Sequence, residues 1–149
     1  MPLNDNTAEI AFETPYSTLF DAPVAVADQD MVDCIGVVGM PSDWTHSSRI
    51  GARHGPEALR RATTRIVREY LPVSEETFFD AQHGGVWRRN EERWIADLGD
   101  ATIDPASVKN TTAAIAEMTE RVRSAGGVPI ALGGDHYNSY PACLRQICT

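Results

Sequence analysis

The sequence has no long apolar run, because no window approaches the roughly 18 consecutive apolar residues that span a bilayer. The N-terminal segment MPLNDNTAEIAFETP carries Asp and Glu where a signal peptide carries Lys or Arg. Cysteine is scarce too. Cys34, Cys143 and Cys148 form an odd set without CxxC spacing, which argues against a disulfide framework and a zinc knuckle. We therefore expect a cytoplasmic protein with no membrane partner.

Basic residues are also few: 13 Lys and Arg stand against 21 Asp and Glu, for a formal net charge of −8. A negative chain repels nucleic acid, whose binding depends on neutralising phosphates. A small cationic substrate suits this balance better than a polyanion does. The 149 residues, 42% of them hydrophobic, are enough for one domain with a core.

The apolar segments recur in an order typical of an α/β protein. Residues 1–30 are polar and interrupted by prolines, which predicts an extended arm anchored through Tyr16, Leu19 and Phe20. Residues 31–149 are expected to form the domain itself. Short apolar runs at 34–40, 94–98 and 128–132 predict buried strands.

Helix signals separate these runs. Gly55-Pro56 and Glu57 predict a helix over 56–70, with Ala58, Leu59, Ala62, Ile66 and Val67 at helical spacing. Asp104-Pro105 predicts a second helix that ends at Gly126-Gly127, and LRQI predicts the start of another. Residues 71–93 show no sustained periodicity and are predicted to be an irregular connection. Alternating strands and helices predict a parallel sheet with helices on both faces, whose ligand residues follow the carboxyl ends of the strands.

His136 is the first candidate site residue, because Gly133-Gly134-Asp135-His136 follows the third apolar run. An imidazole at this edge of the sheet is suited to binding a metal, and Asp135 to orienting a neighbouring group. A surface turn whose histidine is only solvated is the more frequent explanation for these four residues. The residues alone leave both interpretations open.

A glycine-rich loop before the first helix carries two arginines. It has the charge to bind an anion, but salt bridges to a neighbouring segment or subunit explain Arg49 and Arg53 more simply. Its residues of interest are Arg49, Gly51, Ala52, Arg53, Gly55 and Pro56.

Other polar groups are assigned to the surface. Arg60, Arg61, Arg65 and Arg68 share a helix with Glu57 and Glu69, which indicates a solvated face. His46, His54 and His83 lack a partner at a metal-ligand spacing, and Gly36 and Gly39 lack the rest of a dinucleotide-binding motif.

Three segments, IGVVGMPSDWTHSSRIGARHGPEALR, WIADLGD and PIALGGDHYNSYP, together resemble the N-terminal half of the arginase, agmatinase and guanidinobutyrase family. The resemblance covers residues 34–141. It implies a three-layer α/β/α sandwich and hydrolysis of a guanidino group, agmatine-like by preference, to urea and an amine by two Mn²⁺ ions. It also implies that His136 is a metal ligand and that the loop of Arg49 and Arg53 is structural. A complete member is expected to be a homo-oligomer.

The same resemblance implies that most metal ligands come from a DAHxD and a DxD segment, and neither occurs in this sequence. Asp100 and Asp135 are expected near His136, but two carboxylates are too few for two Mn²⁺ ions. Asn138 and the glycine-free THSSR segment also depart from the family pattern and leave the substrate open. We therefore expect a truncated fold that is inactive alone. The alternative is a short noncatalytic chain that binds a full-length relative through an exposed sheet edge.

Overall fold

The structure, a computed structural model, describes residues 17–45, 47, 49–70, 77–80, 82–88 and 94–144. Its centre is a parallel sheet in the order β4-β1-β5. The strands are β1 (Ile35–Met40), β4 (Ile95–Asp100) and β5 (Val128–Gly133). The three apolar runs are thus adjacent parallel strands, as the sequence predicted.

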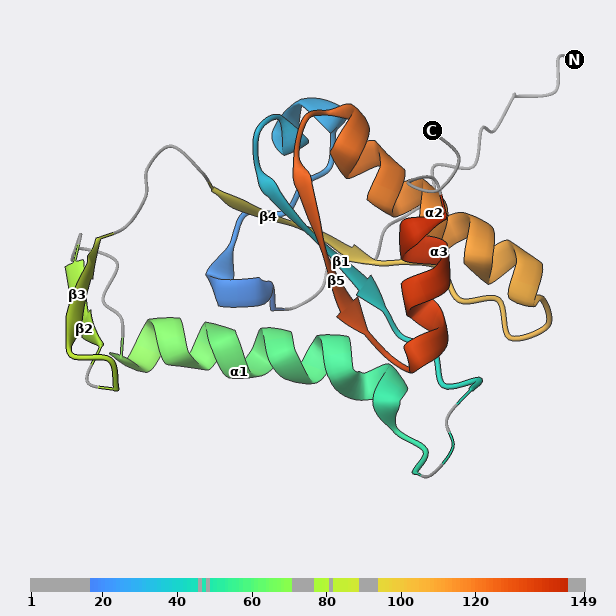
Figure 1. Cartoon of the computed structure of the whole chain (residues 1–149), viewed down its shortest axis with the longest axis horizontal. Helices are drawn as coiled ribbons and strands as arrows, with labels where there is room; N and C mark the ends of the chain where they lie inside the picture. Colours follow the sequence, from blue (N-terminus) through green and yellow to red (C-terminus); the bar gives the residue numbers. More distant parts are fainter. Residues whose placement is uncertain are drawn as a thin grey trace, which may run out of the picture.

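Helices cover both faces of this sheet, which gives the predicted α/β/α layers. Figure 1 shows α1 (Gly55–Tyr70) on one side of the strands and α2 (Val108–Ser124) on the other. The main core lies on the α2 side. It contains Val38, Met40, Ala96, Leu98, Ile115, Met118 and Val122. Gly36 lets the sheet and α2 approach closely, because a Cβ at this position would lie 2.6 Å from a methyl of Val122.

The face toward α1 is packed differently. The helix buries Pro56, Arg60 and Thr64, one per turn, whereas Leu59 and Ile66 are exposed. The apolar spacing correctly predicted a helix, but most of the residues that carry it lie outside the buried face. A smaller cluster of Leu19, Val37 and Leu132 completes this side.

The segment before β1 lies along the outer edge of β4. It contains the short 3-10 turns η1 (Leu19–Asp21) and η2 (Asp28–Met31), joined by a stretch that pairs with the strand. Ala25 N–H donates to the Asp97 carbonyl, and Asp97 N–H donates to the Pro23 carbonyl, both at 2.9 Å. Leu19 is buried and Phe20 exposed, and Tyr16 lies outside the described residues.

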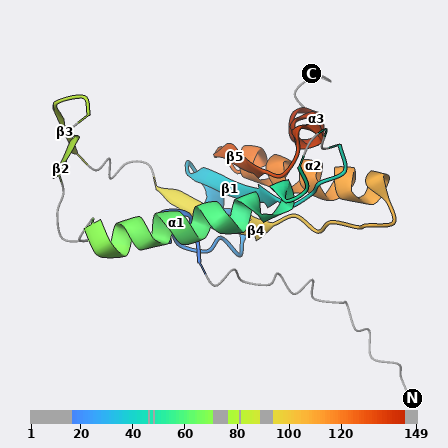
Figure 2. The ribbon, with the colours of Figure 1, turned by 90° about the horizontal axis from the view of Figure 1, so that it is seen from below.

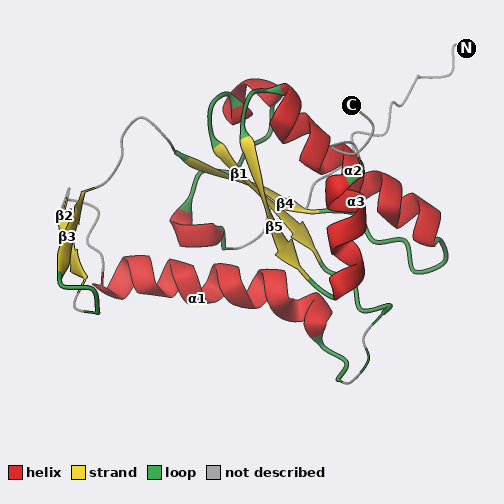
Figure 3. Ribbon diagram, in the orientation of Figure 1, coloured by secondary structure: helices red, strands yellow, loops and turns green. Residues whose placement is uncertain are grey.

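Two predicted boundaries need correction. Residues 71–93 contain a hairpin of β2 (Thr77–Asp80) and β3 (Gly85–Arg88), rather than only an irregular connection. Figures 2 and 3 show it beyond the C-terminal end of α1, away from the three-stranded sheet. The second helix begins at Val108, three residues after the predicted start, because Ser107 is its N-cap and accepts from Asn110 N–H at 3.2 Å.

The last helix, α3 (Ser139–Cys143), ends before the LRQI segment at which the sequence predicted a helix to begin, and residues 145–147 of that segment lie outside the described chain. Among the described helices, none combines the length and apolar character that crossing a membrane requires.

Candidate functional site

The carboxyl ends of β1, β4 and β5 meet at one edge of the sheet, because the strands are parallel. Here the chain leaves β5 through Gly134, whose N–H donates to the Met40 carbonyl at 2.9 Å. A Cβ at position 134 would overlap the Ser42 carbonyl oxygen. The second glycine of the Gly-Gly-Asp-His segment is therefore required by its contact with the loop that follows β1.

Asp135 fixes that same loop. Its carboxylate is buried and accepts hydrogen bonds from Thr45 N–H and, at 3.1 Å, from Tyr137 N–H. Its own N–H donates to the Ser42 carbonyl at 2.9 Å. Asp135 therefore orients backbone groups, and its oxygens face N–H donors.

Asn138 strengthens the connection between this segment and the loop after β1. The buried side chain donates from Nδ2 to the Met40 carbonyl at 2.9 Å and accepts from Ser42 Oγ at 2.8 Å. Tyr137 is directed toward α2, since its hydroxyl lies 2.8 Å from Thr112 Oγ1.

His136 lies three residues beyond β5, in the 3-10 turn η4 (His136–Asn138). Its side chain is exposed at the carboxyl edge of the sheet. Within the described part of the chain, no group of three or more His, Cys, Asp and Glu side chains is arranged to hold a metal ion. The metal role of His136 stays a prediction.

The loop before α1 is organised by Asp43. This buried carboxylate accepts from Gly51 N–H at 3.0 Å and Arg53 N–H at 2.8 Å, and it lies 3.7 Å from the Arg53 guanidinium. Gly51 has φ +130°, a conformation that favours glycine. An anion at Arg53 would meet the Asp43 carboxylate, which favours the structural interpretation. His54 and His83 are exposed as expected, and His46 lies outside the described residues.

Arg60 corrects the assignment of the α1 arginines to a solvated face. Arg61, Arg65 and Arg68 are exposed, but Arg60 is only 1% exposed and points into the sheet. Its Nε and one terminal nitrogen each donate to an Asp97 carboxylate oxygen at 2.9 Å. That terminal nitrogen also donates to the Gly99 carbonyl at 2.9 Å, and the other donates to Asp100.

The charges around Arg60 keep it ionised. Burial works to lower the pKa of the guanidinium, but the hydrogen bonds and negative charges of Asp97 and Asp100 outweigh it and raise the pKa. Asp97 is 0% exposed and also accepts from Leu19 N–H and Gly99 N–H, each at 2.9 Å. The ion pair is thus enclosed and its carboxylate fully hydrogen-bonded.

Gly39 makes room for this network, because a Cβ there would overlap the Asp100 carboxylate. Asp100, expected beside His136, is therefore held by Arg60. Arg60 shares one helical face with the buried Pro56 and Thr64, four residues before and after it, and no local sequence signal distinguishes it from the exposed arginines of α1.

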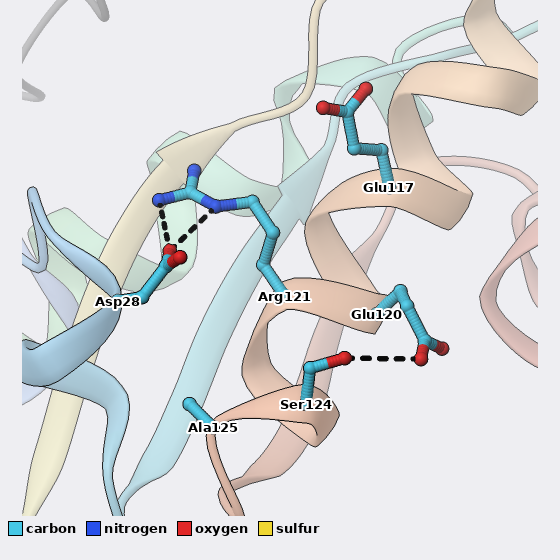
Figure 4. A pocket seen from close by; sticks show the side chains of 6 residues that line it. All are labelled: Asp28, Glu117, Glu120, Arg121, Ser124 and Ala125. Carbon is cyan, nitrogen blue, oxygen red and sulfur yellow. Dashed lines mark hydrogen bonds and ion pairs between the residues drawn. The ribbon is translucent and has the colours of Figure 1, made fainter.

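A separate cavity of about 220 Å³ lies where the C-terminal part of α2 faces η2. Figure 4 shows Arg121 directed toward Asp28, to which its Nε and a terminal nitrogen donate at 3.1 and 3.0 Å. Ser124 Oγ donates to Glu120 at 3.2 Å. Because α2 begins after the carboxyl end of β4 and ends before the amino end of β5, this cavity is remote from His136.

Comparisons with known proteins agree with these features. The family model described as Arginase family matches residues 33–147. The chain is 31% identical to a guanidinopropionase of Pseudomonas aeruginosa, over 72% of this chain and 30% of that protein. It is 32% identical to an agmatinase of Pyrococcus horikoshii, over 82% of this chain and 38% of the relative.

A solved structure of a hypothetical agmatinase from Burkholderia thailandensis superposes with a TM-score of 0.68 and 25% identity. The match covers 91% of this chain and 40% of that one. The chain therefore spans between about a quarter and two fifths of the length of the curated relatives it matches, such as the mitochondrial agmatinase of Gallus gallus, of which 27% is covered.

Proposed function

Because this chain belongs to the arginase family, we propose that it supplies the N-terminal part of a metal-dependent hydrolase of guanidino compounds. The observation that supports this most directly is the carboxyl edge of the sheet, where the Gly-Gly-Asp-His segment is locked onto the loop after β1. The names of the relatives, guanidinopropionase and agmatinase, point to small guanidino substrates. An agmatine-like substrate in the cytoplasm is the specific form of the proposal.

In this proposal His136 is the metal ligand that the chain contributes, and Mn²⁺ is the metal. A two-metal centre lowers the pKa of a bound water and stabilises charge during hydrolysis. The described residues do not fit such a centre by themselves, because Asp43, Asp100 and Asp135 already accept hydrogen bonds from protein donors. In this proposal the remaining ligands come from segments other than the described residues.

The chain of 149 residues is therefore expected to release no urea by itself. The test is a urea-release assay with agmatine, arginine and guanidinobutyrate in the presence of Mn²⁺, with the His136→Ala variant in parallel. We expect the same background rate for both proteins. Turnover of roughly 1 per second that His136→Ala abolishes would show that the chain assembles a complete site and would overturn the assignment of ligands elsewhere.

The second candidate role is noncatalytic. β5 is an edge strand of the described sheet with exposed Val128 and Ile130, which suits binding to another polypeptide. The two roles differ in one observable. A regulatory chain changes the urea-release rate of a full-length relative when the two are mixed, whereas an incomplete enzyme leaves that rate unchanged.

A further inference from the structure

Residues 18–25, which we call the latch, lie across two elements that are distant from them in the sequence. The first half of the latch contacts α1, where Thr64 Oγ1 donates to the Thr18 carbonyl at 2.8 Å. The second half pairs with β4 through two backbone hydrogen bonds of Asp97. Leu19 N–H donates to the Asp97 carboxylate at 2.9 Å. The latch is therefore held by a small set of polar contacts that all reach α1 or β4.

The turn inside the latch has a strained backbone. Phe20 and Asp21 are consecutive, and their φ values of +55° and +58° lie in the left-handed region that residues other than glycine rarely adopt. Such conformations persist only where surrounding contacts impose them. Here Phe20 N–H donates to Thr63 Oγ1 at 3.0 Å and Arg68 donates to Asp21 at 3.1 Å, both at exposed positions. Release of the latch from α1 therefore relieves strain.

Few apolar contacts oppose that release. Leu19 is the only buried apolar side chain of the latch, and Phe20 is 46% exposed. Pairing with β4 is limited to a single bridge, between Val24 and Asp97. Segments with little buried apolar surface and few backbone hydrogen bonds open at a lower free energy than the core of a protein.

Opening of the latch also leaves the buried polar groups beneath it with partners. When Leu19 N–H leaves, the Asp97 carboxylate keeps both hydrogen bonds from Arg60 and the one from Gly99 N–H. Thr63 Oγ1 keeps a hydrogen bond at 2.9 Å to a carbonyl of its own helix. Because no buried charge loses its counter-charge, the large cost of breaking an enclosed ion pair does not arise.

We propose that the latch opens and closes as one unit on α1 and β4 while the three-stranded sheet stays folded. In the closed state the Pro23 carbonyl and Ala25 N–H occupy the backbone groups of Asp97. In the open state those groups of Asp97 face water, and the outer edge of β4 becomes accessible. The latch is thus a conformational device that guards one edge of the sheet. It operates whether or not the chain is part of a hydrolase.

Native-state hydrogen exchange of the 149-residue chain, followed by NMR, tests this opening. The amides of Leu19, Ala25 and Asp97 make the latch contacts and report on the latch. The amides of Val37 and Val38 report on the sheet, since β1 is paired on both sides. We expect one common protection factor for the three latch amides, at least about tenfold below that of the two sheet amides. Asp97 is the most informative, because it lies within β4 yet should exchange with the latch.

Two substitutions separate opening of the latch from unfolding of the whole domain. Leu19→Ala removes the buried anchor and should speed the exchange of the latch amides by about tenfold or more. Ile115→Val, in the main core on the α2 side, is the control. It should speed the exchange of Val37 and Val38 by about two- to tenfold and leave the latch amides unchanged, because the core stays packed when only the latch opens.

Three results would overturn the proposal. An Asp97 N–H as strongly protected as the Val38 N–H would show that the latch opens only when the domain unfolds. Equal acceleration of latch and sheet amides by Ile115→Val would show the same. Clearly different protection factors for Leu19, Ala25 and Asp97 would show that the latch does not move as one unit.

Discussion

At the scale of single residues, the buried carboxylates of this fold hold backbone segments in place. Asp43 fixes the loop before α1, Asp97 joins η1, α1 and β4, and Asp135 fixes the loop after β1. Each is satisfied by protein N–H donors, so a cation at any of them would displace hydrogen bonds. The buried acidic residues therefore serve the packing of the loops, and His136 is not among the side chains that these contacts hold.

Arg60 allows a quantitative prediction at this scale. Arg60→Met leaves Asp97 buried without its counter-charge, which typically costs about 3–5 kcal/mol of unfolding free energy. The control is Arg61→Met on the next position of α1, where an exposed guanidinium lies 3.6 Å from Glu57. That substitution should cost about 0–1 kcal/mol. Urea denaturation measures both values, and similar costs would contradict an enclosed ion pair.

The role of Arg60 was missed because sequence patterns describe hydrophobic faces better than polar ones. The apolar periodicity of α1 correctly predicted a helix, although Leu59 and Ile66, which contribute to it, are exposed. A buried arginine is only recognisable once Asp97 is known to lie opposite it, and that contact spans 37 positions of sequence.

At the scale of elements, two sets of side-chain hydrogen bonds stabilise the start of α2. Asp104 accepts from Ala106 N–H at 2.9 Å and from Asn110 Nδ2 at 2.7 Å, while Ser107 caps the helix. The hydrogen bonds from Asn110 and Ala106 lower the pKa of Asp104. Asp104-Pro105 correctly predicted a helix start in this region. Asp104 forms the turn before the helix, however, and Ser107 is the N-cap.

The contributions of the Asp104 carboxylate and the Ser107 hydroxyl to stability should depend differently on pH. A carboxyl whose folded pKa lies below its unfolded value contributes stability above the unfolded pKa and loses it as pH falls through the folded pKa. Asp104→Ala should therefore lower Tm at neutral pH, by an amount that decreases as the pH falls below 3.8, the ordinary pKa of an aspartic acid, and disappears below the folded pKa. Ser107→Ala should cost about 1 kcal/mol at every pH. Thermal unfolding of both variants between pH 7 and acid is the measurement, and a pH-independent loss for Asp104→Ala would contradict this role.

The sequence predicted the strands of the parallel sheet but not the β2-β3 hairpin, because only the former have a strong local pattern. β1, β4 and β5 are short, mainly apolar segments between turn residues, a pattern typical of strands in a parallel sheet, although β5 is buried only at Leu132. Residues 77–88 lack a long alternating pattern, so β2 and β3 follow from their mutual pairing and from Gly84 at φ +67° in the turn. Local sequence does not encode that pairing strongly.

At the scale of the whole molecule, the scaffold of the site and its chemistry are separable. The sheet, both helical layers and the locked Gly-Gly-Asp-His turn are all formed by the described residues. The metal-binding groups among them are too few for a closed centre. The order of the motifs predicted the sheet and the helices well. Which carboxylates are already hydrogen-bonded, and so not free to bind a metal, could be seen only in the folded chain.

This separation predicts how the chain responds to Mn²⁺. A ligand that binds only the folded state raises Tm as its concentration exceeds its dissociation constant. Two Mn²⁺ ions need several carboxylates to offset four positive charges, and Asp100 and Asp135 remain engaged by Arg60 and by backbone N–H groups. We therefore expect no saturable rise in Tm on adding Mn²⁺, and no Mn²⁺ retained after dialysis by metal analysis. His136→Ala serves as the control and should behave identically. A saturable rise that His136→Ala removes would mean that His136 and its neighbours form a metal site within this chain.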